Sequence, residues 1–301
     1  MIEAGAPKTL GAQEFCKYHA LGNDYLVIDA MTFGADITPT GMAALCHRHL
    51  GVGADGVLVL GPKGPGADAA LRIFNPDGSE AEKSGNGLRI FGRALYDLGY
   101  VSDEQLRVRL GGALVHLQLL MEPGATGGGR RRVALIRAGM GRPQFDSASV
   151  HMAGPKRATV TLPLEVLGQT LDVTAVSMGN PHCVHVVSEL DVAQLRALGP
   201  AIERHPAFLQ RTNVQLVRVL GRRKLQLLIW ERGAQETSAS GSSSCAAVAA
   251  AQARGLIDEE GEIEVHSPGG VLRVQRAEDG ELLLTGPAEP VCRGIWLAAT
   301  P

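Results

Sequence analysis

The sequence predicts an α+β fold made of two similar halves. Three observations carry this prediction: many short strand-like runs bounded by Gly, Pro or Asp, one predicted helix in each half that is expected to be buried, and one motif that returns 156 residues later. A helix that is apolar all round is a buried helix. Each half is therefore expected to wrap a strand-rich sheet around one such helix.

The strand signals are short runs rich in Leu and β-branched residues. They cover residues 25–29, 56–61, 70–74, 106–110 and 114–120 in the first half, and 157–162, 182–187, 213–219 and 225–230 in the second. Apolar residues recurring at spacings of three and four predict helices over 40–49, 87–98, 192–198 and 243–254. The last of these is almost entirely Ala, Cys and Val, so we expect it to be buried.

The internal repeat defines the two halves. The stretch FNPDGSEAEKSGNG (74–87) aligns without a gap with WERGAQETSASGSS (230–243), which pairs Ser84 with Ser240 and Gly85 with Gly241. A second match pairs HALGNDYLVID (19–29) with VSMGNPHCVHV (176–186) at an offset of 157. Two matches at nearly one offset predict two similarly folded halves. We place them at 1–126 and 127–285, with 1–12 a loose extension and 286–301 returning to the first half.

Composition limits the classes of function. The 301 residues are 45% hydrophobic and carry a net charge of −2, which gives no electrostatic footprint for nucleic acid or an anionic membrane. No apolar run approaches the roughly 18 residues of a membrane span, and the N-terminus lacks the order of a signal peptide. Five cysteines without CxxC spacing favour reduced thiols. We therefore expect a soluble, cytoplasmic protein without nucleic-acid or membrane partners.

Two motifs that suggest a nucleotide or a metal are better explained otherwise. GVGADG (51–56) matches a dinucleotide-binding pattern, but it follows a predicted helix and precedes a strand, which reverses the required order. The nine histidines include His182 and His185, which point to opposite faces of a strand, and no HExxH or Cys-His cluster occurs. We expect neither a nucleotide nor a metal site.

Both copies of the repeat place Ser-Gly at the start of a buried helix. The first N–H groups of a helix have no partner inside it, and the helix dipole is positive there, so each start can receive an anion. If the halves pack about a pseudo-two-fold axis, a substrate carboxylate would lie between Ser84 and Ser240. Inverting the neighbouring α-carbon requires a base on one face and an acid on the other. The alternative is that both serines are ordinary N-caps.

The sequence resembles the diaminopimelate epimerase family from Phe15 onward. The resemblance rests on KYHALGNDYLVID, GVGADGV, FNPDGSEAEKSGNG, SMGNPHCV, RTNVQ and ERGAQETSASG. It implies a cytoplasmic homodimer that needs no cofactor and no pyridoxal. It also implies two pseudo-symmetric halves, each a barrel-like antiparallel sheet around a central helix. The reaction implied is the interconversion of LL- and meso-diaminopimelate by two-base proton transfer, in lysine and peptidoglycan precursor synthesis.

The resemblance also implies the site residues. The distal amino-acid end of the substrate would be held by Asn23, Asn75, Asn180, Asn213 and Arg232. The reacting carboxylate would lie on Gly85, Asn86, Gly241 and Ser242. His182 and Glu231 would tune the reacting centre, and Glu231 would also contact the substrate. These residue types suit an amino acid, because Asn both donates and accepts and Arg can clamp a carboxylate with two hydrogen bonds.

The chain departs from the family pattern at two kinds of position. Ser84 and Ser240 stand where the pattern has the two catalytic cysteines, and Gly56 stands where some members have a substrate-contacting Gln. A hydroxyl is a far weaker acid than a thiol, so we predict a chain that keeps the binding site and turns over slowly or not at all. The pair fits a Cys-to-Ser variant, a natural homologue, or an alkoxide mechanism assisted by neighbouring groups.

Two other functions remain open at this stage. The chain could bind a diamino acid without turning it over. It could also be a related isomerase or an eliminating enzyme acting on another amino acid, since elimination needs a base on one face only. The serine pair is the feature that distinguishes these two functions from epimerisation.

Overall fold

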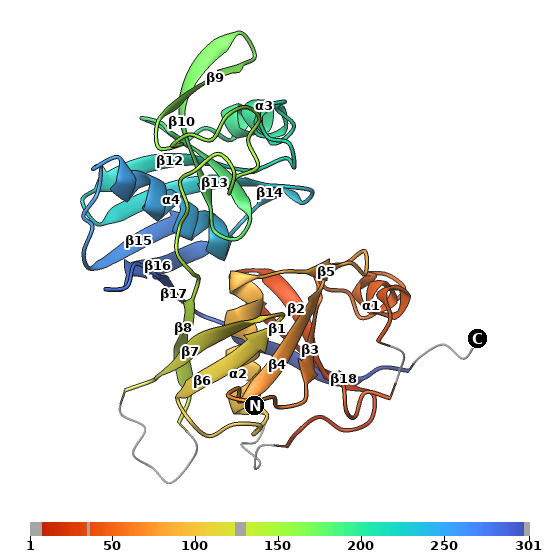
Figure 1. Ribbon diagram of the computed structural model, residues 1–301. Helices are drawn as coiled ribbons and strands as arrows, with labels where there is room; N and C mark the ends of the chain where they lie inside the picture. Colours follow the sequence, from red (N-terminus) through yellow and green to blue (C-terminus); the bar gives the residue numbers. More distant parts are fainter. Residues whose placement is uncertain (1–7, 35–36, 124–130, 298–301) are drawn as a thin grey trace. The chain divides into compact units, whose positions relative to one another are not determined.

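The structure is a computed structural model that describes residues 8–34, 37–123 and 131–297 (Figure 1). The chain divides into two compact units, one formed by Met1–Ala138 with Gly286–Pro301 and the other by Gly139–Thr285. The boundary predicted between residues 126 and 127 lies outside the described residues. The observed division comes later because strand β8 (Val133–Gly139) pairs with β7 (Ala113–Met121) of the first unit.

The first unit is a single ladder of strands. Its order is β18 (Glu289–Ile295), β1 (Glu14–Ala20), β2 (Asn23–Asp29), β3 (Val57–Gly61), β4 (Ala69–Phe74), β6 (Gln105–Leu110), β7 and β8. The short strand β5 (Glu80–Ala81) pairs with the end of β4, just before Ser84. The repeat motif therefore begins at the end of β4 and leads directly into a helix.

The second unit repeats the same ladder. Its order is β9 (Leu162–Val166), β10 (Gln169–Ser177), β11 (Pro181–Val186), β12 (Asn213–Gly221), β13 (Lys224–Glu231), β15 (Glu262–Ser267), β16 (Gly270–Arg276) and β17 (Leu282–Gly286). Strand β14 (Gln235–Thr237) pairs with β13 as β5 pairs with β4. The two pseudo-symmetric halves predicted from the repeat are confirmed.

The sheets are mixed rather than purely antiparallel. The pairs β2–β3 and β4–β6 are parallel in the first unit, and β11–β12 and β13–β15 are parallel in the second. Parallel neighbours need a crossover connection, and a helix supplies each one. In chain order these helices are α1 (Pro39–Cys46), α2 (Gly85–Asp97), α3 (Val192–Glu203) and α4 (Gly241–Ala253).

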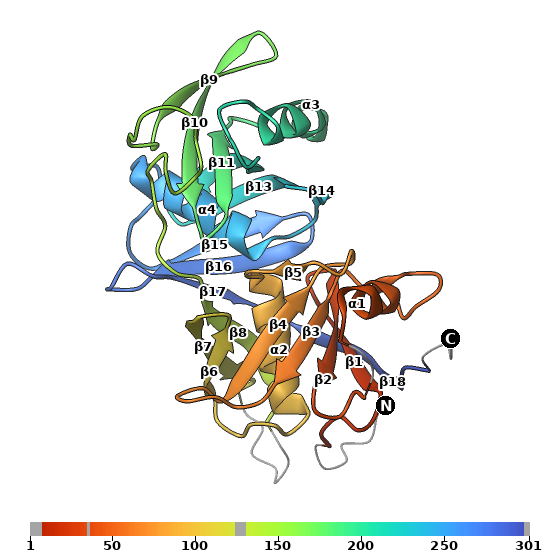
Figure 2. The ribbon, with the colours of Figure 1, turned by 45° about the vertical axis from the view of Figure 1, so that its right-hand side comes forward.

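Helices α2 and α4 are central to their units, as predicted. Helix α2 packs against β18, β1 and β2 at one end of the ladder and against β7 near the other end, so the sheet must curve around the helix. Helix α4 packs in the same way against β10, β11, β12, β13, β15 and β16 (Figure 2). Its Cys, Val and Ala side chains from Cys245 to Ala251 are buried on every side. A curved sheet with one buried helix thus fixes where each helix begins.

The outer face of each sheet carries a second apolar layer. In the first unit, Met42 and Leu45 of α1 pack on Leu26, Ile28 and other residues of β2 and β3. In the second, Leu195, Leu198 and Ile202 of α3 pack on β10, β11 and β12. Strands covered on both faces read as continuous apolar runs, which is why β2 and β3 show no alternation.

Several elements differ from the sequence-based prediction. The run predicted as a strand over 157–162 contributes only Leu162 to β9, while Ala158 forms an isolated bridge with Asp146. Helix α3 extends past its predicted end to Glu203. Residues 1–7 of the predicted N-terminal extension lie outside the described residues, whereas Leu10 is buried and its backbone N–H donates to Tyr100. Among the described residues, no helix is long and apolar enough to span a membrane.

Candidate active site

Ser84 and Ser240 have the same backbone and the same local role. Their φ and ψ angles are −140° and 120° for Ser84 and −143° and 129° for Ser240. The Oγ of Ser84 accepts from the N–H of Gly87 at 3.0 Å, and that of Ser240 accepts from Ser243 at 3.4 Å. Both serines are therefore N-caps. The cap places each hydroxyl beside the first N–H groups of its helix, where an anion would also bind.

A chain of side-chain hydrogen bonds holds the start of α2. The Nδ2 of Asn86 donates to the Oδ1 of Asn23 at 2.9 Å, and the Nδ2 of Asn23 donates to Asp55 at 2.9 Å. On its other side, the Oδ1 of Asn86 accepts from the guanidinium of Arg89 at 2.8 Å. Two predicted site residues, Asn23 and Asn86, are thus brought together, and their amides are oriented by Asp55 and Arg89.

Asp24 anchors this end of the β1–β2 hairpin through two cations. Its carboxylate lies 2.7 Å from the Nζ of Lys17 and 2.9 Å from the guanidinium of Arg48. Burial alone would raise the pKa of Asp24, but the hydrogen bonds from Arg48 and Lys17 outweigh burial and lower it to about 2. The cluster therefore requires the ionised carboxylate.

We expect this cluster to make the first unit sensitive to acid. A carboxyl whose folded pKa is depressed contributes stability that is complete above its unfolded pKa near 3.8 and is lost as the pH falls to about 2. Asp24→Asn should lower the unfolding free energy at pH 7 by about 2 kcal/mol and flatten its pH dependence between roughly pH 4 and 2. Urea unfolding at several pH values measures both. An unchanged slope in that pH range would contradict the assignment.

Asn75 lies apart from this chain of hydrogen bonds. It follows β4, and its Nδ2 donates to the Oγ of Ser79 at 2.9 Å within a turn. Glu80 in the adjacent strand β5 pairs with Arg72 at 3.0 Å on the exposed side of β4. The pseudo-equivalent Glu236 pairs with Arg196 at 2.7 Å. Both glutamates thus brace the loops that lead to the serines.

Ser240 has a carboxylate neighbour in the second unit. Burial raises the pKa of Glu231, and a hydrogen bond from the hydroxyl of Ser240 opposes that rise in part. Gly241 is buried, and Ser242 beside it is half-buried. The start of α4 therefore combines N–H donors with a buried carboxyl group whose pKa is raised.

His182 is fully buried on β11 and uses both ring nitrogens. Its Nε2 lies 2.9 Å from the Oδ1 of Asn180, and its Nδ1 lies 3.1 Å from the Nε2 of Gln215. Burial lowers the pKa of His182 to about 3, the hydrogen bond with Gln215 opposes this, and the cation of Arg232 adds to it. The imidazole is therefore neutral at pH 7, and it orients Asn180.

The remaining predicted residues of the second unit gather at one end of β11, β12 and β13. The backbone N–H of Arg232 donates to the Oδ1 of Asn213 at 2.9 Å, and the Nδ2 of Asn213 donates to the carbonyl of Pro181 at 2.9 Å. The guanidinium of Arg232 is exposed and donates to the carbonyl of Gln210 at 3.0 Å. An exposed guanidinium beside a buried amide suits one end of an amino acid.

Two residues that contact the site were missed in the sequence. Tyr25 contacts Ser84 through its hydroxyl, and Gln215 holds His182 and the Oγ of Ser243 at 3.0 Å. The alignment at offset 157 pairs Tyr25 with His182, and this pairing was the signal that could have identified the tyrosine. Gln215 had no such signal, because its role depends on the β11–β12 register, in which His182 pairs with Asn213.

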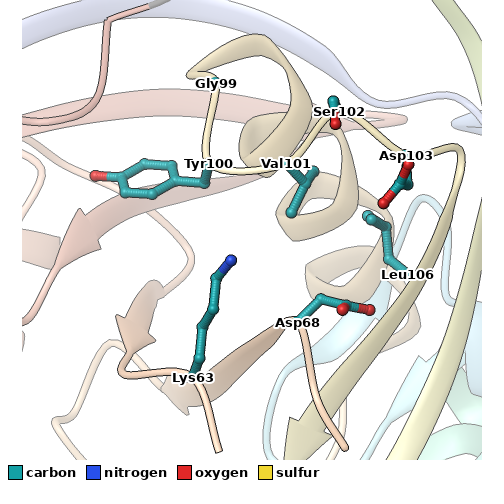
Figure 3. A pocket seen from close by; sticks show the side chains of 8 residues that line it. All are labelled: Lys63, Asp68, Gly99, Tyr100, Val101, Ser102, Asp103 and Leu106. Carbon is teal, nitrogen blue, oxygen red and sulfur yellow. The ribbon is translucent and has the colours of Figure 1, made fainter.

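A surface pocket of about 260 Å³ lies elsewhere on the first unit (Figure 3). Tyr100, Val101 and Ser102 line it after the C-terminal end of α2, and the Lys63 side chain points into it. Ser84 lies at the N-terminal end of the same 13-residue helix. None of the predicted site residues lines this pocket, so we do not assign it to the site.

Relatives of the chain carry one consistent name. The diaminopimelate epimerase family model matches residues 15–134 and 174–291. A diaminopimelate epimerase from Pelotomaculum thermopropionicum is 42% identical over 286 residues, covering 94% of this chain and 98% of that protein. One from Moorella thermoacetica is 40% identical over 282 residues, covering 93% and 98%.

Solved structures share the fold at low identity. A predicted epimerase from Pseudomonas aeruginosa aligns with a TM-score of 0.63 at 18% identity, covering 96% of this chain and all of that one. A probable proline racemase from Agrobacterium radiobacter aligns with a TM-score of 0.69 at 16% identity, covering 95% and 93%. The chain belongs to the diaminopimelate epimerase family.

Proposed function

We propose that this protein binds diaminopimelate and interconverts its LL and meso forms by moving the α-proton between two faces, slowly because its acid–base groups are hydroxyls. The observation that carries the proposal is the pair of equivalent helix starts, each with a capped Ser-Gly and buried N–H groups, in a chain of this family. Such starts suit a carboxylate, and their dipoles would stabilise the enediolate formed when the α-proton leaves.

The roles of individual residues follow from the resemblance. Ser84 and Ser240 stand at the positions of the family's two cysteines and would act as base and acid. Asn23, Asn75, Asn180, Asn213 and Arg232 would hold the distal end of the substrate. The reacting carboxylate would lie on Gly85, Asn86, Gly241 and Ser242. Neutral His182 would act by orienting its neighbours, and buried Glu231, whose pKa is raised, would tune the reacting centre next to Ser240.

We also propose that the protein works in the cytoplasm as a homodimer and without pyridoxal. The dimer is supported by β18, a strand paired with β1 whose residues Val291 and Ile295 are 52% and 60% exposed. An exposed apolar strand is a ready site for a second copy. A sedimentation mass equal to one chain would contradict the dimer.

The test of the function follows the α-hydrogen in heavy water. LL-diaminopimelate incubated with the protein should bind saturably, which calorimetry measures, and should gain deuterium at the α-carbon slowly but above a protein-free blank. Meso product should appear alongside the deuterium. Chromatography and mass spectrometry follow both.

A second function would be favoured by one outcome of that test. The observation behind it is again the serine pair, since two hydroxyls can bind a carboxylate without removing a proton. Saturable binding with no deuterium above the blank would make the protein a diamino-acid-binding member of the family. Absence of binding would contradict both functions.

A further inference from the structure

We propose that Tyr25 positions the acid–base group at residue 84 and stabilises its deprotonated form, and that Gly56 provides the space for the tyrosine ring. This inference rests on the proposed function of Ser84. Tyr25 lies in β2 and is 7% exposed. Its hydroxyl oxygen lies 3.3 Å from the Oγ of Ser84, which also accepts from the N–H of Gly87 at 3.0 Å.

The position of the ring depends on the absence of a side chain at residue 56. Strand β3 runs parallel to β2 with Leu26 opposite Val57, so Gly56 lies beside Tyr25. A Cβ at residue 56 would lie 2.5 Å from the Cε1 of Tyr25 and 2.5 Å from the carbonyl oxygen of Phe74. These distances are too short for non-bonded atoms. A side chain at residue 56 and the ring in its present place therefore exclude each other.

Two donors can converge on the atom at position 84. When that atom is an anion, the Gly87 N–H and the Tyr25 O–H can both donate to it, and donors to a charged acceptor stabilise it more than donors to a neutral one. In the proton transfer, the substrate C–H bond breaks, its electron pair stays on the α-carbon, and the proton goes to the atom at position 84. Tyr25 keeps its own proton throughout, because a phenol is protonated at neutral pH.

The equivalent group in the second unit has a different neighbour. The hydroxyl of Ser240 hydrogen-bonds to the Glu231 carboxyl, which has no proton to donate when it is ionised. A donor therefore faces position 84, whereas a carboxyl faces position 240. Position 240 thus provides an internal control for any effect of Tyr25.

The test measures acidity directly and does not need turnover. In the chain carrying Ser84→Cys and Ser240→Cys, the pH dependence of iodoacetamide alkylation is followed for each introduced thiol by peptide mass spectrometry. Adding Tyr25→Phe should raise the alkylation midpoint at position 84 by about one pH unit, since one donor to the thiolate is lost. The midpoint at position 240 should stay within about 0.3 unit, well under the tenfold change that one unit represents.

Two further variants separate this role from a structural one. Tyr18→Phe removes a hydroxyl from another buried tyrosine of the same hairpin, whose oxygen lies 3.5 Å from Asp97, and should leave the midpoint at position 84 unchanged. Gly56→Ala should displace the ring and raise the midpoint as Tyr25→Phe does. The inference is overturned if Tyr25→Phe leaves the midpoint at position 84 unchanged, or if Tyr18→Phe raises it equally.

The same chains show whether the inference or the proposed function fails. In the doubly substituted chain, Tyr25→Phe should lower kcat for deuterium exchange about tenfold with little change in KM, as expected for a group that acts on the proton transfer. A raised midpoint in chains that never exchange deuterium supports the inference and contradicts the function. An unchanged midpoint in chains that do exchange deuterium overturns the inference alone.

Discussion

Replacing Ser84 and Ser240 together by cysteine is expected to raise the rate of deuterium exchange on LL-diaminopimelate at least about 10³-fold. The reason is the acidity of the two groups. A thiol has a pKa of about 8.5, while the pKa of a hydroxyl is roughly seven units higher, near that of water, and each pKa unit is worth about 1.4 kcal/mol. Forming the base from a serine therefore costs up to about 10 kcal/mol more than forming it from a cysteine.

The local structure recovers only part of that difference. The N–H donors at the starts of α2 and α4 stabilise an alkoxide as they would a thiolate, so they do not remove the gap between the two groups. The expected gain is set below the full pKa difference, because proton transfer follows Brønsted behaviour and other steps limit the rate once the chemistry is fast.

The single variants test whether two faces are used. Ser84→Cys alone and Ser240→Cys alone should each speed exchange on the isomer whose α-hydrogen faces the new thiol, with little inversion, because the opposite hydroxyl is a poor acid. The isomer that exchanges should differ between the two variants. Ser238→Cys adds an exposed thiol outside the helix start and should leave the rate unchanged. A doubly substituted chain that binds the substrate but exchanges no faster would refute the assignment of residues 84 and 240.

The halves and their helices could be predicted from sequence because both features are local or repeated. Ser-Gly before an apolar run fixes the start of α2 and α4 to within two residues, and the offset of 156 makes the second copy support the first. The parallel pairs could not be predicted in this way. Whether Val57 of β3 lies parallel or antiparallel to Leu26 depends on the path of the chain through α1 and not on either strand's composition.

The residues of the candidate site likewise divide into those that sequence motifs identify and those whose role depends on the folded structure. Asn23, Asn86 and both serines lie in motifs, so pattern and resemblance found them. Tyr25 and Asp55 also lie in motifs, but their roles come from contacts with Ser84 and Asn23, which are 59 and 32 residues away in the chain. Arg89 contacts Asn86 within α2. A residue that orients another is visible only once the register of β2 against β3 is known. The run over 157–162 was mispredicted because β-branched residues also fill irregular buried segments, as Thr159 does.

Arg89→Met is expected to lower the unfolding free energy of the first unit by about 3–5 kcal/mol. The reason is that the buried guanidinium donates several of the hydrogen bonds at the start of α2, and the substitution leaves their acceptors without a donor. Arg89 is fully buried. It donates to the carbonyl of Gly85 at 3.1 Å, to the Oδ1 of Asn86 at 2.8 Å and to the carbonyl of Pro287 at 3.4 Å. Methionine fills similar space but leaves these acceptors without that donor.

Unfolding of the first unit can be followed on its own. Trp296 packs against the outer core of that unit, and Trp230→Phe removes the tryptophan of the second unit, so urea unfolding can be monitored by the fluorescence of Trp296. Arg107→Met removes an exposed arginine paired with Asp68 at 3.5 Å and should cost under about 1 kcal/mol. Equal effects of Arg89→Met and Arg107→Met would contradict the role assigned to the buried guanidinium.

Arg89→Lys separates the effect of the positive charge from the effect of the fork-shaped guanidinium. Arg89→Lys keeps the positive charge beneath the start of α2 but cannot reach Gly85, Asn86 and Pro287 from one nitrogen, because a guanidinium presents its donors in a rigid plane and an ammonium does not. If the charge alone mattered, lysine would restore the stability lost in Arg89→Met. We expect it to restore less than half of that loss, because the orientation of the Asn86 amide depends on a donor fixed in place. Asn86 in turn holds Asn23, so the same substitution should also weaken diaminopimelate binding measured on the folded protein.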